Sequence, residues 1–94
     1  MKKIIIEGNN INNVSEFYDE IERVFTKGLT WKIGRNLNAF CDILRGGFGV
    51  FDYEEEITVI WKNALNSERK LGVKDFETIT DVIREHNYIT FIMC

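Results

Sequence analysis

Three short apolar runs divide the chain, and each has the composition of a β-strand. They cover residues 4–6, 57–61 and 88–93 and are rich in β-branched and aromatic side chains, which favour extended structure. The runs are nearly continuous instead of alternating with polar residues, a pattern typical of strands that are buried on both faces. The pattern therefore predicts a parallel sheet covered by helices.

Between these runs, apolar residues recur at the three- and four-residue spacing of amphipathic helices. The spacing predicts four helices, over residues 15–26, 36–45, 64–71 and 75–85. Asn13 or Ser15 is suited to cap the first helix, and Gly28 to end it. Because parallel strands need long crossovers, this order predicts an α/β fold, a three-stranded parallel sheet covered by about four helices in one domain over residues 1–94.

The second predicted helix has two distinct faces. Asn36 is a good N-cap, and the Gly46-Gly47 pair is a strong stop signal. The expected apolar stripe consists of Leu37, Phe40, Cys41 and Leu44. A polar face is expected to carry Asn38, Asp42 and Arg45, which lie three and four residues apart. The residues alone predict that Asp42 is an ordinary exposed carboxylate.

Composition and charge narrow the class of protein. The 94 residues are 45% hydrophobic and 29% charged, with a net charge of −3, values typical of a globular domain without the basic face of a direct nucleic-acid binder. Cys41, Cys94 and His86 are too few for a zinc site, so we expect no metal and no cofactor. The first apolar run is too short for a signal peptide or a membrane span, which predicts a cytoplasmic protein with reduced thiols and no membrane partner.

Few residues of the sequence are candidates for catalysis or ligand binding. Residues 46–49 are glycine-rich but follow a helix, so they are expected to form a stop and a turn instead of a phosphate loop. His86 is a possible general base with Asp81 or Glu85, but a histidine at a helix end more often interacts with the helix dipole. Cys41 is expected to be a buried, inert thiol. No catalytic residue is assigned.

An acidic run over residues 52–56 precedes the second strand. It is expected to be a solvated loop, with attraction of a basic partner as the alternative interpretation.

Residues 33–46 read Ile-Gly-Arg-Asn-Leu-Asn-Ala-Phe-Cys-Asp-Ile-Leu-Arg-Gly. This stretch resembles the signature of the barstar family. In that signature, Gly-x-Asn-Leu-Asp-Ala-Leu-Trp-Asp-x-Leu follows an aromatic-rich segment and precedes a glycine. Residues 2–8 resemble the first strand of that family, and residues 82–93 resemble its last helix and strand. The chain differs in carrying Asn38 for the usual Asp, Cys41 for Trp, and Trp31-Lys32-Ile33 for a tyrosine-rich pair.

The resemblance implies a fold of three parallel strands and four helices, and inhibition of a small basic ribonuclease while that enzyme is inside its producer. In the family, the second helix and the loop before it block the nuclease active site, with an acidic residue where a substrate phosphate would bind. Asp42 matches that position, and Asn38 and Glu85 match further acidic contacts. The implied partner-binding residues are Trp31, Ile33, Gly34, Asn36, Asn38, Asp42, Arg45, Gly46 and Glu85.

The implied partner is a basic ribonuclease, bound by a chain that is monomeric when free. An alternative is an interaction or immunity module of the same fold that binds a different protein. A small hydrolase that uses His86 is a third hypothesis, and it lacks a recognisable nucleophile–base arrangement.

Overall fold

The computed structural model describes residues 2–26, 36–46 and 51–94. Three strands form one parallel sheet in the order β1-β2-β3, namely β1 (Lys2–Glu7), β2 (Ile57–Lys62) and β3 (Ile89–Met93). The helices of the described ranges are α1 (Val14–Phe25), α2 (Leu37–Arg45), α3 (Ala64–Leu71) and α4 (Val73–Arg84), with a 3-10 turn η1 (Gly8–Asn10) after β1. The predicted fold class is confirmed.

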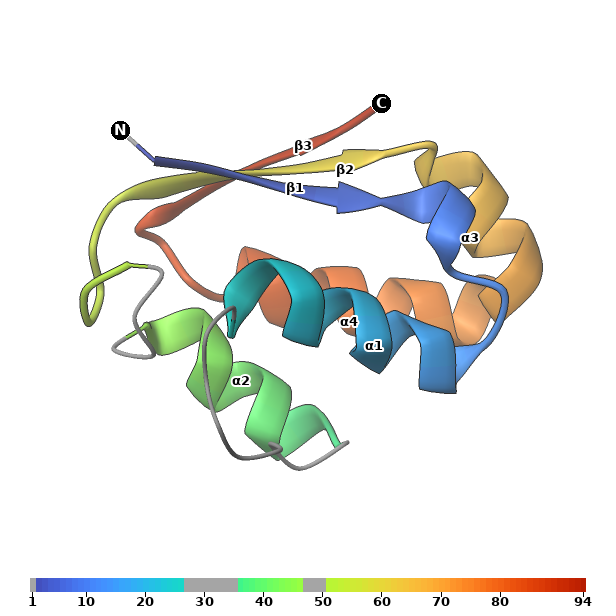
Figure 1. Cartoon of the computed structure of the whole chain (residues 1–94), viewed down its shortest axis with the longest axis horizontal. Helices are drawn as coiled ribbons and strands as arrows, with labels where there is room; N and C mark the ends of the chain where they lie inside the picture. Colours follow the sequence, from blue (N-terminus) through green and yellow to red (C-terminus); the bar gives the residue numbers. More distant parts are fainter. Residues whose placement is uncertain (1, 27–35, 47–50) are drawn as a thin grey trace.

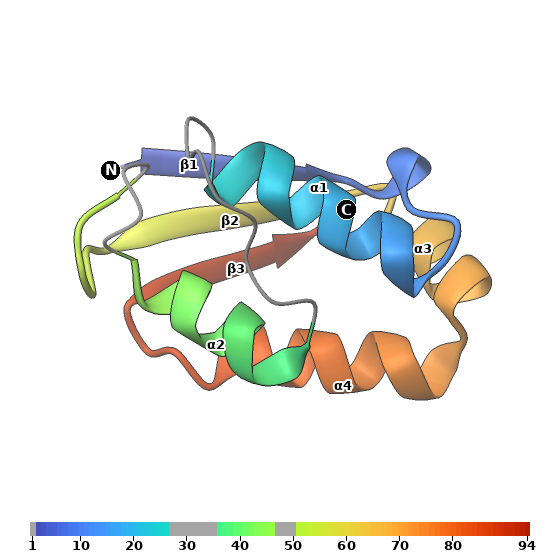
Figure 2. The ribbon, with the colours of Figure 1, turned by 60° about the horizontal axis from the view of Figure 1, so that its bottom comes forward.

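The helices are distributed unevenly around the sheet. Figure 1 shows α1, α2 and α4 on one side of the strands, and α3 at the end where β1 and β2 finish. In Figure 2, α1 runs along the β1 side of the sheet, while α2 and α4 lie toward β3. The crossover from β1 to β2 therefore contains α1 and α2, and the crossover from β2 to β3 contains α3 and α4.

The expectation that the strands are buried on both faces is wrong for the edge strands. β1 alternates between exposed and buried positions, and Ile5 and Ile92 are 41% and 44% exposed. Both pair in register with Ile60 of the central strand, so three isoleucines form a row on the face that carries no described helix. The sequence pattern was misleading because this row of isoleucines lies on the open face, which otherwise carries polar residues such as Lys3 and Thr90.

The ends of the helices follow the predicted signals closely. The Asn13 side chain caps α1 by accepting a hydrogen bond from the Glu16 amide at 2.8 Å. Helix α3 has the predicted bounds, and α4 begins two residues earlier than predicted, directly after Gly72. The predicted stop at Gly28 lies outside the described residues.

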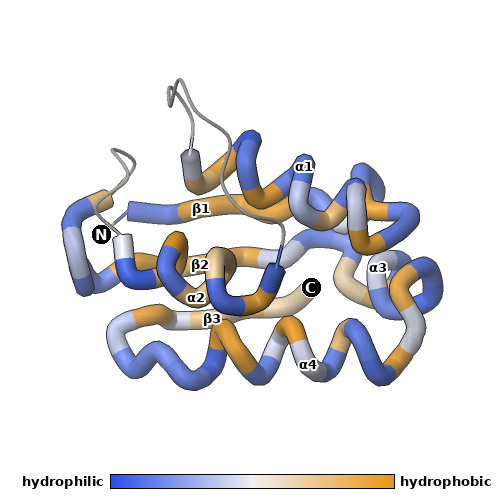
Figure 3. The backbone as a smooth tube through the Cα atoms, turned by 90° about the horizontal axis from the view of Figure 1, so that it is seen from below, coloured by the Kyte–Doolittle hydropathy of each residue, from blue (hydrophilic) through white to orange (hydrophobic). Residues whose placement is uncertain are grey.

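An aromatic cluster joins the sheet to the helices. Trp61 of β2 stacks on Phe17 of α1 with ring centroids 5.9 Å apart, and it contacts Phe76 of α4 edge-on with ring centroids 5.2 Å apart. Phe40 of α2 in turn meets Phe17 edge-on at 5.2 Å. Figure 3 shows the hydropathy along the backbone: hydrophobic segments lie in the strands, and they recur along each helix between polar ones. This cluster fixes α2 against the body of the fold.

Glu20 is a buried carboxylate that ties α1 to the end of β1. It accepts hydrogen bonds from the Glu7 amide at 2.8 Å, from Asn10 Nδ2 at 3.1 Å, and from Arg23 Nε and an Arg23 terminal nitrogen at 2.9 and 2.6 Å. Burial raises the pKa of Glu20, but these hydrogen bonds outweigh it and hold the pKa below its usual value.

Replacing Glu20 with glutamine is expected to lower the free energy of unfolding at pH 7 by about 2 kcal/mol, because an amide cannot accept all of these donors. A carboxyl with a lowered pKa in the folded state stabilises the fold above its unfolded pKa of about 4.5, and this contribution is lost as the pH falls through the folded value. Urea midpoints at pH 7 and pH 3 should therefore differ less for Glu20→Gln than for the wild type. A pH-independent effect of this substitution, or an equal effect of Glu56→Gln at an exposed position, would contradict this role.

Candidate functional site

Helix α2 presents one face to the core. Asn36 caps it by accepting a hydrogen bond from the Ala39 amide at 2.8 Å. The buried side chains of the helix are Phe40, Ile43 and Leu44. The predicted stripe is therefore partly wrong: Leu37 is 39% exposed and Cys41 is only partly buried, while Ile43 was missed. The buried face of the helix is centred on Phe40, which packs on Phe17 of α1, with Ile43 and Leu44 on either side of it.

The opposite face of α2 is polar, as predicted. Asn36, Asn38, Asp42 and Arg45 are all exposed. Asp42 Oδ1 and an Arg45 terminal nitrogen are 3.8 Å apart, with side chains 64% and 52% exposed. A solvent-screened pair at this distance contributes little to stability. Asp42 is therefore available to an external partner without a structural role of its own.

A polar pocket of about 300 Å³ lies beside the end of α2. It is lined by Cys41 and Arg45 of α2, by Glu54 from the segment before β2, and by residues 85–88 between α4 and β3. Hydrogen bonds join these segments: the Tyr88 hydroxyl donates to Leu44 O at 3.0 Å, and the Glu54 amide donates to Arg45 O at 2.6 Å. Segments that are distant in sequence thus form one surface at the amino ends of β2 and β3.

The charge around this pocket is predominantly negative. Glu54 and Glu85 lie on its walls and Arg45 is the lining cation. Helices α2 and α4 both end at this edge, so the negative ends of their dipoles add to the field. Burial raises the pKa of the Tyr88 hydroxyl, and the nearby Glu54 carboxylate raises it further. The electrostatic field at this pocket therefore favours positive charge.

The acidic run before β2 is largely solvated, as predicted. Asp52, Tyr53, Glu54 and Glu56 are exposed. Glu55 accepts a hydrogen bond from the Asp52 amide at 2.8 Å and pairs with Lys2 at 3.5 Å, and both contacts lower its pKa, the amide most. The run also supplies Glu54 to the pocket.

Cys41 and His86 form a side-chain pair inside the pocket. Cys41 Sγ lies 3.7 Å from His86 Nε2, and His86 Nδ1 lies 2.8 Å from Val82 O in the last turn of α4. The contact with Val82 confirms the expected interaction of His86 with the helix end. The expectation that Cys41 is buried is corrected: the residue is only partly buried, and it has an imidazole neighbour.

Comparison with protein families shows which family this chain belongs to. A family model described as Barstar (barnase inhibitor) matches residues 1–89. The chain belongs to the barstar family. No curated protein matches the chain. The barstar family is one of protein inhibitors of a barnase-like ribonuclease, and it is not a family of enzymes.

The structure brings some of the residues expected from the barstar signature together. Asn36, Asn38, Asp42, Arg45 and Gly46 lie along α2 and at its ends, where Gly46 is buried, and Glu85 lines the same pocket as Arg45. Trp31, Ile33 and Gly34, and also Lys32, lie outside the described residues. Five further pocket residues were not predicted as part of the site: Cys41, Glu54, His86, Asn87 and Tyr88. The acidic run gave Glu54 as an alternative contact for a basic partner, but no local sequence signal places the four residues outside α2 beside it, because only the crossovers bring them there.

Gly46 positions this barstar-type helix against the segment before β2. Its φ is 90° and its ψ −168°, a conformation that is essentially restricted to glycine. A Cβ atom here would collide with Asp52 O and would lie 2.7 Å from the Phe51 ring. Gly72 has the same φ of 90°, but a Cβ atom there would meet no atom within 4 Å.

Gly46→Ala is therefore expected to destabilise the fold more than Gly72→Ala. Each substitution has a conformational cost of about 1–3 kcal/mol, and only Gly46→Ala adds a collision with backbone. Urea denaturation of the two variants measures the difference. Equal midpoints would show that the contact of α2 with Phe51 and Asp52 is unimportant.

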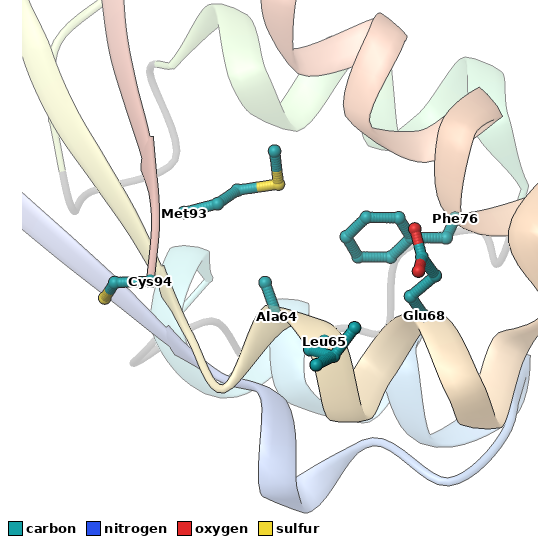
Figure 4. A pocket seen from close by; sticks show the side chains of 6 residues that line it. All are labelled: Ala64, Leu65, Glu68, Phe76, Met93 and Cys94. Carbon is teal, nitrogen blue, oxygen red and sulfur yellow. The ribbon is translucent and has the colours of Figure 1, made fainter.

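A second pocket lies at the opposite end of the sheet. It has a volume of about 280 Å³ and is lined by Ala64, Leu65, Glu68, Phe76, Met93 and Cys94. Figure 4 shows the Met93 and Phe76 side chains pointing toward each other across it. Open parallel sheets usually bind ligands at this carboxyl end, but Glu68 is the one charged residue among the described lining residues. The polar surface around α2 is therefore the better candidate site.

Two features, a membrane-spanning helix and a cluster of metal ligands, are absent from the described ranges. No helix there combines the length and apolar composition needed to span a bilayer. No three His, Cys, Asp or Glu side chains there gather as a metal-binding group.

Proposed function

We propose that this protein inhibits a small, basic, extracellular-type ribonuclease in the cytoplasm of the producing cell, by covering the enzyme's active site with the polar face of α2. Membership of the barstar family over residues 1–89 is the observation that carries this proposal. The exposed position of Asp42 supports it, because Asp42 matches the acidic residue that occupies the substrate-phosphate site in the family.

The chemistry of a ribonuclease active site explains why such a face would bind. An enzyme that holds phosphates concentrates Arg and Lys side chains around them. The Asp42 carboxylate projects from a helix that is already folded, capped by Asn36 and anchored by Phe40. It can accept charge-assisted hydrogen bonds from several cations with little loss of conformational entropy. In this complex Asp42 takes the place of a substrate phosphate.

The surroundings of Asp42 extend the proposed interface. Glu85 and Glu54 add negative charge at the pocket, and the exposed Asn36, Asn38 and Arg45 complete the described surface. Gly46, which is assigned to the interface from the family signature, is buried. Trp31, Ile33 and Gly34 are assigned to it from the family signature alone. The free inhibitor is proposed to be a monomer that binds no nucleic acid, requires no cofactor and has no catalytic residue. Complementary charge would speed association and make it sensitive to salt.

RNA cleavage by a panel of small basic ribonucleases, titrated with this protein, tests the proposal. The expected result is complete inhibition of one enzyme at one equivalent, with affinity falling as salt rises from 50 to about 500 mM. A complex whose affinity responds neither to salt nor to loss of Asp42 would contradict the proposed mechanism.

The departures of this chain from the family signature favour one alternative. Asn38 is neutral where the signature usually has Asp, and Cys41 stands where it has Trp. Both changes lie on or beside the proposed interface, so they are suited to alter the choice of partner. If no ribonuclease is inhibited, the same surface is proposed to act as an immunity or interaction module for a different basic protein, which a pull-down with wild type and Asp42→Ala would identify.

A further inference from the structure

The hydrogen bonds of His86 define which ring nitrogen faces Cys41. Nδ1 lies 2.8 Å from Val82 O, and a carbonyl oxygen can only accept, so Nδ1 carries a proton. In the neutral ring, Nε2 then has a free lone pair. Cys41 Sγ lies 3.7 Å from this atom. The backbone of α4 thus orients the imidazole as a proton acceptor for the thiol, the arrangement that activates nucleophilic cysteines.

We propose that Cys41 is a thiol activated by His86 that forms mixed disulfides with low-molecular-weight disulfides, and that this modification controls access to the polar face of α2. In the reaction, the Cys41 proton passes to His86 Nε2 and the thiolate attacks one sulfur of the disulfide. The new S–S bond forms as the old one breaks, and the leaving thiolate takes up a proton. A thiol reductant reverses the exchange.

The pocket provides access for this reaction. Cys41 is partly exposed and lines a polar pocket of about 300 Å³. Arg45 in the pocket lining would attract a carboxylate-bearing disulfide such as oxidised glutathione, whereas Glu54 and Glu85 would repel it. Tyr88 contacts the His86 ring edge-on at 5.6 Å and holds it in place. Activation of the thiol therefore depends on His86, whose Nε2 lies 3.7 Å from Cys41 Sγ.

The position of Cys41 links the modification to binding. Cys41 directly precedes Asp42, and a mixed disulfide would fill the pocket between Arg45 and Glu85. This part of the inference rests on the proposed function. The modified protein is expected to lose inhibition and to recover it on reduction.

Cys94 provides an internal comparison, since it is a more exposed free cysteine. Oxidised glutathione is added at pH 7 to Cys94→Ser, which retains Cys41, and to Cys41→Ser, which retains Cys94, and intact mass is followed with time. Cys41 is expected to react at least about tenfold faster than Cys94, although it is less exposed. His86→Asn in the Cys94→Ser background keeps a donor for Val82 but lacks Nε2, and it should remove this advantage.

The outcomes separate the two parts of the inference. If Cys41 reacts no faster than Cys94, activation of the thiol is refuted, and this comparison does not depend on whether a His86 variant folds. If folded His86→Asn reacts as fast as its parent, the role of His86 in activation is refuted as well. If Cys41 is modified but the modified protein inhibits a ribonuclease unchanged, control of α2 is refuted. If the unmodified protein inhibits no ribonuclease, the proposed function fails. The reaction rates of Cys41 and Cys94 still test whether the Cys41 thiol is activated.

Discussion

Asp42→Ala is expected to weaken the complex with the cognate ribonuclease by at least about 30-fold, equivalent to about 2 kcal/mol or more. The substitution removes the carboxylate that would face the enzyme's phosphate-binding cations and leaves those cations buried without a partner. It should leave the thermal midpoint nearly unchanged, because Asp42 is 64% exposed and its contact with Arg45 is 3.8 Å long. Inhibition titrations and thermal denaturation measure the two effects.

Asp81→Ala is a matched control for this experiment. Asp81 of α4 lies 3.8 Å from Arg84 in the same three-residue spacing as Asp42 and Arg45, and its side chain is 72% exposed. We expect it to change the affinity by less than about threefold, as is typical of a charge outside the interface. Equal losses for the two variants would indicate a general charge effect, and a large fall in thermal stability for Asp42→Ala would show that Asp42 is structural.

Phe40→Ala is expected to destabilise the fold by about 3–5 kcal/mol. The Phe40 side chain has no exposed surface and meets Phe17 edge-on at 5.2 Å. Its removal leaves a cavity where α2 joins the aromatic cluster around Trp61. The free energy of unfolding from urea denaturation gives the magnitude.

Leu37→Ala tests whether the effect depends on the buried face of the same helix. Leu37 is 39% exposed, so its replacement should have an effect of less than about 1 kcal/mol. An unchanged denaturation midpoint for Phe40→Ala, or an equal loss for Leu37→Ala, would mean that the face of α2 against the core is assigned incorrectly.

The fold was predictable from sequence because each element carries its own local signal. Asn13 and Asn36 both cap helices as their positions indicated, and the three apolar runs are the three strands. Side-chain exposure was less predictable, since it depends on which faces other elements cover. Ile5 and Ile92 look like core residues in sequence but lie on the open face of the sheet.

The candidate site was predictable only where it is continuous in sequence. The polar face of α2 follows from spacing, and its exposed Asn38 and Asp42 agree with that expectation. The pairing of Cys41 with His86 joins residues from different crossovers, so it depends on how α2 packs beside the end of α4. No local pattern contains that information.

Competition with a nucleotide tests the central claim most directly. A non-hydrolysable mononucleotide bound in the active site of the inhibited ribonuclease is displaced by titration with this protein, and free nucleotide is measured. If the polar face of α2 covers the active site, displacement is complete at one equivalent of wild type and requires much more Asp42→Ala. A ternary complex that retains the nucleotide at saturating protein would contradict the account.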